Sequence, residues 1–292
     1  MFRSAFVAVL FLHGFASAQL TDAEKKATLS YIVTLQDLAT GAYKVEPGGK
    51  PGLRATSGAV RSFGYIGAKK FGVELPNLDK TRAFVLASMD PMGGGWQEPG
   101  GKPDVTITSI GLMTAAEIGF PAGTYPRSLD YLKANAATFE DVRIGAAAMD
   151  SLKKKPEWVD AWIKLANAQL NNDGTAGKGD GQARDTASVA AMKLRLGYPL
   201  ANKTKVIAAI RDGQRADGGW GKADAKASDL ETTYRVMRAL MLLKEKPKDV
   251  KALNAWLSKH RNTDGGYAME PGKPSSMSAV YYVSAIGSFL EK

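Results

Sequence analysis

The acidic residues that could take part in catalysis or bind a cation lie at the starts of apolar helical patterns. Asp229 and Glu231 begin one such pattern, and Asp104 and Asp185 hold comparable places before two others. Carboxylates gathered at the mouth of one cavity could perform acid–base work or hold a hard cation. The competing interpretation is structural, because acidic residues in a first helical turn cap the helix and complement its dipole. Ser228 and Glu231 have the spacing of a capping box, which favours that interpretation.

Two arginines follow these carboxylates on the same expected helix and could bind an anion. Arg235 and Arg238 carry planar guanidinium groups that match a diphosphate or a sulfate. Arg235 also lies four residues after Glu231, so an ion pair along the helix is the competing interpretation. The candidate catalytic residues are therefore Asp229 and Glu231, and the polar candidates for substrate binding are Arg235, Arg238, Asp185 and Asp104.

Composition removes several classes of chemistry. The 292 residues include no cysteine and two histidines, His13 and His260, with a formal net charge of +10. Disulfides, thiol nucleophiles, iron–sulfur clusters, thiolate zinc sites and multi-histidine metal sites are therefore excluded. We expect neither a metal nor another cofactor, and we expect His260 at the surface beside Lys259 and Arg261. The lysines are scattered and no nucleic-acid-binding pattern is visible, so we expect no nucleic-acid partner.

The first 18 residues have the pattern of a signal peptide. Arg3 gives a positive start, residues 5–15 are apolar, and Ala16-Ser17-Ala18 provides an A-x-A cleavage signal. Cleavage after Ala18 would leave 274 of the 292 residues. We expect this mature protein to be exported to the periplasm or the medium. No other stretch approaches the length of about 18 apolar residues that a transmembrane helix needs, so we expect no membrane span.

The remaining chain is repetitive. Prolines that follow apolar helical stretches recur at spacings of 45, 35, 43 and 48 residues, which is the period of stacked helical units. These prolines are Pro76, Pro121, Pro156, Pro199 and Pro247. Six units fit into residues 19–292, and the third, around 131–152, has lost the glycines of the others.

Each unit is expected to contain two helices joined by a glycine turn. In the fifth unit, residues 203–214 form the first pattern, Gly218 and Gly219 suit a turn, and residues 229–244 form the second. The sixth unit repeats this plan and ends with a pattern over 277–290. Because no clean alternation typical of strands appears, we predict an all-α fold.

The glycine turn lies inside a longer motif. Gln214, Gly218 and Trp220 form the pattern Q-x-x-x-G-x-W, and Arg261, Gly265 and Tyr267 form a degenerate copy. The motif resembles that of terpene cyclases such as squalene–hopene cyclase, and residues 228–240 resemble repeats in the β subunits of protein prenyltransferases. The chain is thus similar to the prenyltransferase/squalene-oxidase repeat family. This resemblance implies one α/α toroid over residues 19–292, with six inner and six outer helices around a central cavity.

Three aromatic residues at the motif or its counterparts complete the candidate site. Trp220, Trp96 and Tyr267 could contact a ligand in the cavity of such a toroid. The competing interpretation is that they clamp neighbouring units together, as repeat consensus residues generally do. The glutamine amide could assist by bonding the backbone of the next turn.

The residues that carry the family's chemistry are missing. No D-x-D-D string for substrate protonation occurs, and no thiolate is available for the zinc site of protein prenyltransferases. Aligned on Asp229, the family's zinc patterns place Thr232 at the histidine position and Glu231 at the cysteine position. The sequence therefore leaves open whether the protein is an enzyme.

Three functions follow as hypotheses. The resemblance implies binding or transformation of an isoprenoid, such as a prenyl diphosphate, or of another small hydrophobic ligand in the central cavity. An exported glycan-active enzyme is the second, because α/α toroids also host polysaccharide lyases and hydrolases, and it would need two facing carboxylates or an acid–base pair beside a cation. A non-catalytic binding or scaffold protein is the third, using the concave surface of the repeats.

Overall fold

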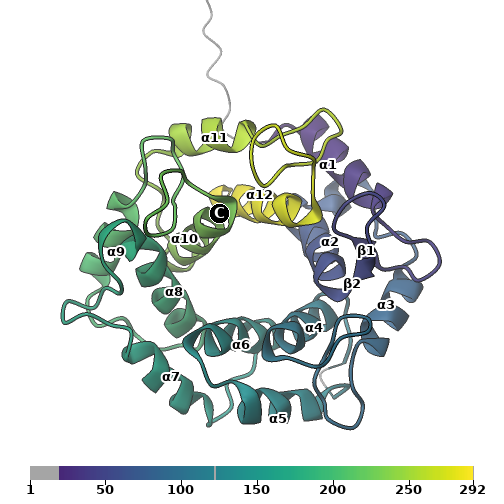
Figure 1. The fold of residues 1–292 in the computed structure, drawn as a ribbon, viewed down its shortest axis with the longest axis horizontal. Helices are drawn as coiled ribbons and strands as arrows, with labels where there is room; N and C mark the ends of the chain where they lie inside the picture. The colour runs from purple at the N-terminus through teal and green to yellow at the C-terminus, as the bar shows by residue number, and fades with distance from the viewer. Residues whose placement is uncertain (1–19, 122, 292) are drawn as a thin grey trace, which may run out of the picture.

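The computed structural model describes residues 20–121 and 123–291. The expected signal peptide, residues 1–18, lies outside the described residues. In the part of the chain that the structure describes, twelve α-helices form two concentric rings (Figure 1). The outer helices are α1 (Asp22–Thr34), α3 (Leu78–Ala87), α5 (Pro126–Asn135), α7 (Val159–Asn167), α9 (Lys203–Asp212) and α11 (Val250–Ser258). The inner helices are α2 (Leu53–Ile66), α4 (Val105–Glu117), α6 (Phe139–Leu152), α8 (Gln182–Arg195), α10 (Leu230–Leu243) and α12 (Met277–Leu290).

Extended structure is minor, so the prediction of an all-α toroid is confirmed. Strands β1 (Tyr43–Lys44) and β2 (Pro51–Gly52) pair antiparallel in the first unit. Two short 3-10 helices, η1 (Ala68–Phe71) and η2 (Gly179–Gly181), complete the elements. The helix expected over 277–290 has those bounds, while the one expected over 203–214 ends two residues earlier, at Asp212.

Neighbouring inner helices run in the same direction. Tyr234 and Tyr281, the fifth residues of α10 and α12, meet through their hydroxyls at 2.8 Å. Arg61 and Met113, the ninth residues of α2 and α4, also meet, with Nη1 3.7 Å from Sδ. All the inner helices therefore begin at the same end of the ring. The position of a residue along its helix gives its depth below that end, at about 1.5 Å per residue.

Turn glycines make close contacts between neighbouring units. Gly218 has φ +102°, and a Cβ there would lie 2.3 Å from the carbonyl of Ala252 on α11. Gly265 has φ +84°, and a Cβ there would lie 2.6 Å from the carbonyl oxygen of Ala27 on α1. Any side chain would force the units apart, because contacts this short leave no room for an added carbon. The second of these contacts joins the last unit to the first.

The ring is closed by further contacts at this seam. Helix α12 packs against α2, next to α1 (Figure 1). The Thr28 hydroxyl donates to the carbonyl of Gly265 at 2.9 Å, and the Met277 amide donates to the carbonyl of Val45 at 2.7 Å. Because the ring closes, all six inner helices face one central space.

The glutamine and tryptophan of the sequence motif hold units together. The Gln214 amide nitrogen donates to the carbonyls of Gly218 and Asp249, both at 2.8 Å, and its oxygen accepts from the Asp249 amide at 2.7 Å. Trp220 is completely buried, and its indole nitrogen donates to the carbonyl of Ile210 at 2.9 Å. These bonds satisfy the open ends of α9 and α11, so the motif has the structural role that its position in the repeat indicates.

Candidate functional site

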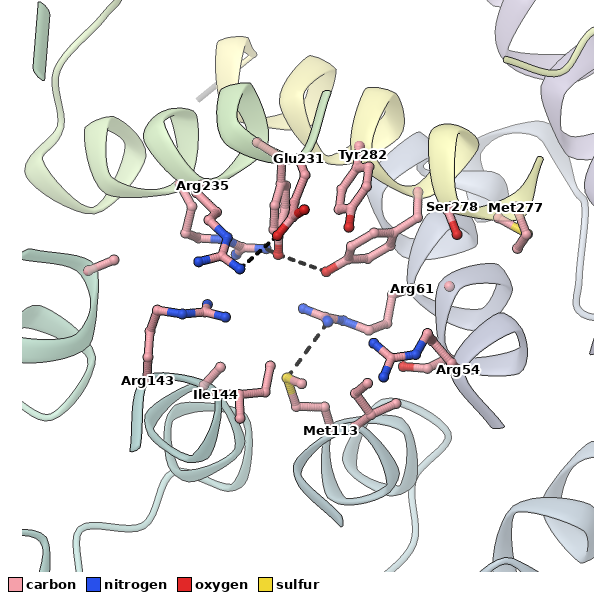
Figure 2. Close-up of a pocket in the computed structure, with 18 of the residues that line it drawn as sticks. Arg54, Arg61, Met113, Arg143, Ile144, Glu231, Arg235, Met277, Ser278 and Tyr282 are labelled. Atoms are coloured by element: carbon pink, nitrogen blue, oxygen red, sulfur yellow. Dashed lines mark hydrogen bonds and ion pairs between the residues drawn. The ribbon is translucent and has the colours of Figure 1, made fainter. Parts of the chain in front are cut away.

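A cavity opens at the centre of the inner ring. It contains about 1040 Å³ of space free of atoms, its open mouth included, and all six inner helices contribute to its wall. Figure 2 shows that Arg54, Arg143 and Arg235 point into this space from different helices. The cavity is therefore made by the closed ring as a whole and not by one unit.

Positive charge dominates the described lining. Six arginines line the cavity, and Glu231 is the single carboxylate among its lining residues. A concave wall with one sign of charge concentrates field and attracts anions. The arginines are Arg54 and Arg61 on α2, Arg143 on α6, Arg195 on α8, and Arg235 and Arg238 on α10.

Two of the arginines nearest the mouth are held by carboxylates. Arg235 contacts Glu231 at 2.7 Å and Glu140 at 3.1 Å, and Arg143 contacts Glu140 at 2.9 Å. Burial would raise the pKa of Glu140, but the charges of Arg143 and Arg235 outweigh it and lower that pKa. The same carboxylates raise the pKa of Arg235 against the effect of burial. We call Arg54, Arg143 and Arg235 the rim arginines.

The other three arginines, Arg61, Arg195 and Arg238, lie deeper, and we call them the deep arginines. Among the described residues, neither Arg61 nor Arg238 has a carboxylate within ion-pair distance, and Arg195 has only Asp150, at 3.8 Å. The Nε–H groups of Arg195 and Arg238 are buried with no hydrogen-bond partner among these residues. Burial and the charge of Arg238 lower the pKa of Arg195 to about 10. Three partly buried cations so poorly compensated are costly to fold, which is typical of a binding site rather than of a structural core.

Tyrosine hydroxyls supply the missing contacts. Arg238 Nη2 donates to the hydroxyls of Tyr65 at 2.6 Å and Tyr234 at 3.1 Å, and Arg61 Nη2 donates to Tyr65 at 2.9 Å. The Arg238 guanidinium also lies 4.3 Å from the centre of the Phe289 ring, within the range of a cation–π contact. The aromatic residues therefore hold Arg61 and Arg238 in place without neutralising their charge.

The opposite wall is aliphatic. Ile110 and Met113 on α4 and Ile144 on α6 line it, and the small side chains of Ala147 and Ala191 continue it. In Figure 2, Met113 and Ile144 face Glu231 and Tyr282 across the cavity. The cavity thus combines a cationic side with an apolar side.

The structure brings together three of the residues singled out in the sequence. Glu231, Arg235 and Arg238 all line the cavity, at three heights along α10. The ion pair expected between Glu231 and Arg235 forms, and Glu231 also lies 3.8 Å from Lys222. Glu231 is therefore placed to hold an arginine at the rim.

The candidate aspartates lie at helix starts and do not line the cavity. Asp229 accepts a hydrogen bond from the Thr232 amide at 2.8 Å, and Asp104 accepts one from Ile107 at 2.7 Å. Asp185 lies in the first turn of α8 and meets Arg184 at 3.4 Å.

The capping box expected at Ser228 and Glu231 does not form. Asp229 is the N-cap of α10, and the Ser228 hydroxyl donates instead to Asp217 at 2.7 Å. The sequence expectation was wrong by one position, because Asp217 in the preceding turn takes the serine hydroxyl.

The candidate aromatic residues are buried between the two rings. Trp220 and Trp96 are at most 1% exposed and do not line the cavity, and the Trp96 indole nitrogen donates to the Ser128 hydroxyl at 2.9 Å. Tyr267 is also buried and borders a different cavity at the seam between α1, α11 and α12. Their positions match the clamping role that the sequence offered as the competing interpretation.

Sequence reasoning missed most of the cavity's polar residues. Arg54, Arg61, Arg143 and Arg195 each stand on an inner helix, and Tyr234 precedes a recognised arginine by one residue. A usable signal existed, because an arginine within a buried run of small and apolar residues needs an explanation. Arg61, between buried Val60 and Ser62, has that signal.

No metal site or membrane span was found in the described parts of the chain. No group of three histidine, aspartate or glutamate side chains there could hold a metal ion. No helix between residues 20 and 291, apart from the undescribed position 122, is long and apolar enough to cross a bilayer.

Comparison with models of protein families identifies the family of this toroid. The model of the prenyltransferase alpha-alpha toroid domain matches residues 128–292, more than half of the chain. The protein belongs to this family. A search of curated proteins found no match.

Solved structures with the same fold include catalysts of unlike chemistry. The type II terpene cyclase MstE from Scytonema, in a variant bound to geranylgeranyl dihydroxybenzoate, aligns with a TM-score of 0.60 at 13% identity, over 92% of this chain and 96% of its own. A family 76 glycoside hydrolase (mannosidase) from Bacteroides thetaiotaomicron aligns with a TM-score of 0.61 at 9% identity, over 92% and 98% of the two chains. At such identities the likeness shows the fold alone.

Proposed function

We propose that the central cavity binds an anionic isoprenoid, with its acidic head group on the arginines and its chain along the aliphatic wall. The observation that carries the proposal is the lining, in which six arginines face one carboxylate beside an apolar surface. Guanidinium groups match the geometry of diphosphate and carboxylate oxygens better than any other side chain. A prenyl diphosphate has both parts that this lining would recognise.

The head group would lie among the deep arginines. Arg61 and Arg238 share the Tyr65 hydroxyl, at 2.9 and 2.6 Å from their Nη2 atoms, so their charges converge on one region of the cavity. An anion bound there would relieve the repulsion between them. The free energy that the protein spends on burying these charges would then contribute to affinity.

The chain would follow the opposite wall. Ile110, Met113 and Ile144 offer apolar contact, and burying each methylene of a ligand contributes about 0.8 kcal/mol. The structural neighbour MstE is bound to a molecule that joins a geranylgeranyl chain to a benzoate, which is also an isoprenoid with an acidic group. This supports an isoprenoid anion as the ligand class.

The proposal is one of binding. The D-x-D-D string and the thiolate ligands of the family's catalysts are absent from the sequence, so we assign neither cyclisation by that acid nor a zinc-dependent transfer. Glycoside hydrolysis would need a second carboxylate facing Glu231 at about 5–10 Å. Glu140 is a second carboxylate at the rim, but Glu140 and Glu231 both bind the Arg235 guanidinium, at 3.1 and 2.7 Å, and the lowered pKa of Glu140 makes it a poor general acid.

Calorimetry with three related ligands tests the proposal. We expect geranylgeranyl diphosphate to bind with a dissociation constant in the micromolar range or below, and both geranylgeraniol and inorganic pyrophosphate to bind at least about tenfold more weakly, a loss of about 1.4 kcal/mol each. The alcohol lacks the charge and pyrophosphate lacks the chain. Absence of saturable binding of the diphosphate ester would overturn the proposal.

A pair of variants assigns the binding to the cavity. Arg238→Met removes a deep guanidinium, and Arg211→Met removes one from the outer helix α9 as the matched control. We expect only the first to weaken binding of the diphosphate ester. Equal affinities of the two variants would place the ligand elsewhere.

A further inference from the structure

The deep arginines need a counter-charge that the carboxylates do not provide. Arg61 and Arg238 have no ion pair among the described residues, and the single partner of Arg195 is Asp150, at 3.8 Å. A buried cation without a compensating anion is strongly unfavourable. Its charge therefore favours the ionised form of the nearest acidic groups and lowers their pKa. Those groups are tyrosine hydroxyls.

One hydroxyl is in the best position to respond. Tyr234 Oη accepts a hydrogen bond from Arg238 Nη2 at 3.1 Å and lies 2.8 Å from Tyr281 Oη. A guanidinium donor together with a second hydroxyl that is able to donate is an environment that stabilises a phenolate. Both tyrosines line the cavity, so the oxygen is within reach of a ligand.

We propose that Tyr234 is the proton-accepting group of the cavity. Its phenolate is the counter-ion of the deep arginines when the cavity is free, and it takes up one proton when an acidic head group binds there. This inference rests on the proposed function for the identity of the ligand, while the ionised state of Tyr234 in the free protein is independent of it.

The charged and titratable side chains around Tyr234 support its role as the proton acceptor. They come from each helix that packs against it. Arg61 and Tyr65 face it from α2, Arg195 from α8, Arg238 from its own helix, and Tyr281 and Tyr282 from α12. Burial alone would raise the pKa of Tyr234, but the charges of Arg238, Arg61 and Arg195 outweigh it and lower that pKa. Burial raises the pKa of Tyr281, so Tyr281 keeps its proton and donates it to the Tyr234 oxygen.

Binding then becomes coupled to a proton. When an anion occupies the deep arginines, it compensates the charges that held the phenolate, and the Tyr234 oxygen takes a proton from water or buffer. An O–H bond forms on Tyr234, a base remains in solution, and no electrons are exchanged. A ligand with an acidic hydrogen near this oxygen could donate that proton itself, which makes Tyr234 a base available to chemistry in the cavity.

Ultraviolet absorbance of the ligand-free protein is the first test. At about pH 8 an ordinary tyrosine is protonated, so we expect a phenolate signal equivalent to one of the ten tyrosines. The signal should vanish in Tyr234→Phe and persist in Tyr282→Phe, which removes the neighbouring cavity hydroxyl as a control. Tyr281→Phe, which removes a donor, should move the titration to higher pH. A wild-type spectrum without phenolate at this pH, or one unchanged by Tyr234→Phe, overturns the inference.

Proton uptake on binding is the second test. Geranylgeranyl diphosphate is titrated calorimetrically into wild type and Tyr234→Phe, each in two buffers of different ionisation enthalpy. Because proton changes of the ligand itself are common to both proteins, we expect wild type to take up about one proton more per ligand. Binding with equal proton uptake overturns the inference and leaves the proposed function intact. Absence of binding overturns the proposed function, and the absorbance then decides the state of Tyr234 alone.

Discussion

Arg61 and Arg238 show, at the scale of single residues, how the proposed binding site would cost the protein stability. Each is partly buried, each touches tyrosines rather than carboxylates, and the two share the Tyr65 hydroxyl. Folding has to bring their like charges together, which costs free energy. Such residues are expected where binding and stability conflict.

Replacing one deep arginine should separate the two effects. We expect Arg61→Met, which keeps most of the side-chain volume, to leave the free energy of unfolding unchanged or to raise it by about 1–3 kcal/mol. The same variant should bind geranylgeranyl diphosphate at least tenfold more weakly, by about 1.4 kcal/mol. Denaturant unfolding and calorimetry measure the two quantities. A large loss of stability would show that Arg61 serves the fold instead.

The lowered pKa of Tyr234 should make the free energy of unfolding depend on pH. Its pKa is about 10 in the unfolded chain and lower in the native protein, because three guanidinium charges outweigh burial. The unfolded state therefore binds more protons in the window below pH 10, and this residue makes stability increase with pH there. The benefit is lost as the pH falls through the lowered native pKa.

Comparison with Tyr234→Phe isolates this contribution. We expect the free energy of unfolding of the wild type to rise, relative to the variant, by up to about 1.4 kcal/mol per pH unit within that window. Thermal or denaturant unfolding at several pH values measures it. Parallel curves for the two proteins would contradict the assignment of a phenolate.

At the scale of elements, helix caps account for the aspartates that stood out in the sequence. Asp229 bonds the Thr232 amide, and Asp104 bonds the Ile107 amide. We expect Asp229→Ala to cost about 1 kcal/mol of stability and Asp229→Asn much less, since an amide oxygen also caps. Neither should change the affinity for the diphosphate ester more than about threefold, or about 0.7 kcal/mol. Loss of binding at unchanged stability would restore Asp229 to the site.

The turn glycines give a second prediction at this scale. Gly218→Ala places a carbon 2.3 Å from the Ala252 carbonyl and should destabilise the protein by more than about 3 kcal/mol. Gly272→Ala is the matched control, because its φ is +80° and nothing lies within 4 Å. The control should cost only about 1 kcal/mol, the strain of the left-handed backbone. Equal losses of stability in the two variants would mean that the close contact with α11 does not contribute to the cost of Gly218→Ala.

The sequence predicted elements better than side-chain roles, for a physical reason. Apolar periodicity, glycine turns and the proline spacing report local structure, so the helices and the repeat were recovered. His260 was expected at the surface because its neighbours are basic, yet it is 2% exposed and packs on Trp256 with ring centres 4.6 Å apart. Periodicity across Lys259, His260 and Arg261 could not reveal a contact that the turn between helices creates.

At the scale of the molecule, the cavity exists because the ring closes. Arg61 comes from the first unit and Tyr281 from the last, and they meet across the seam, with the guanidinium 5.2 Å from the ring centre. The sequence showed that units repeat but not how they are stacked, so it could not show which side chains would converge from distant units. Arg61 and Arg195, from the first and fourth units, face the same space for this reason and were not linked in the sequence.

A crystal structure of the protein with geranylgeranyl diphosphate tests the central claim most directly. The account predicts the diphosphate oxygens within hydrogen-bond distance of the Arg61 and Arg238 guanidinium groups, with the chain against Ile110, Met113 and Ile144. A central cavity without the ligand, or a diphosphate at the seam cavity beside Tyr267, would contradict it.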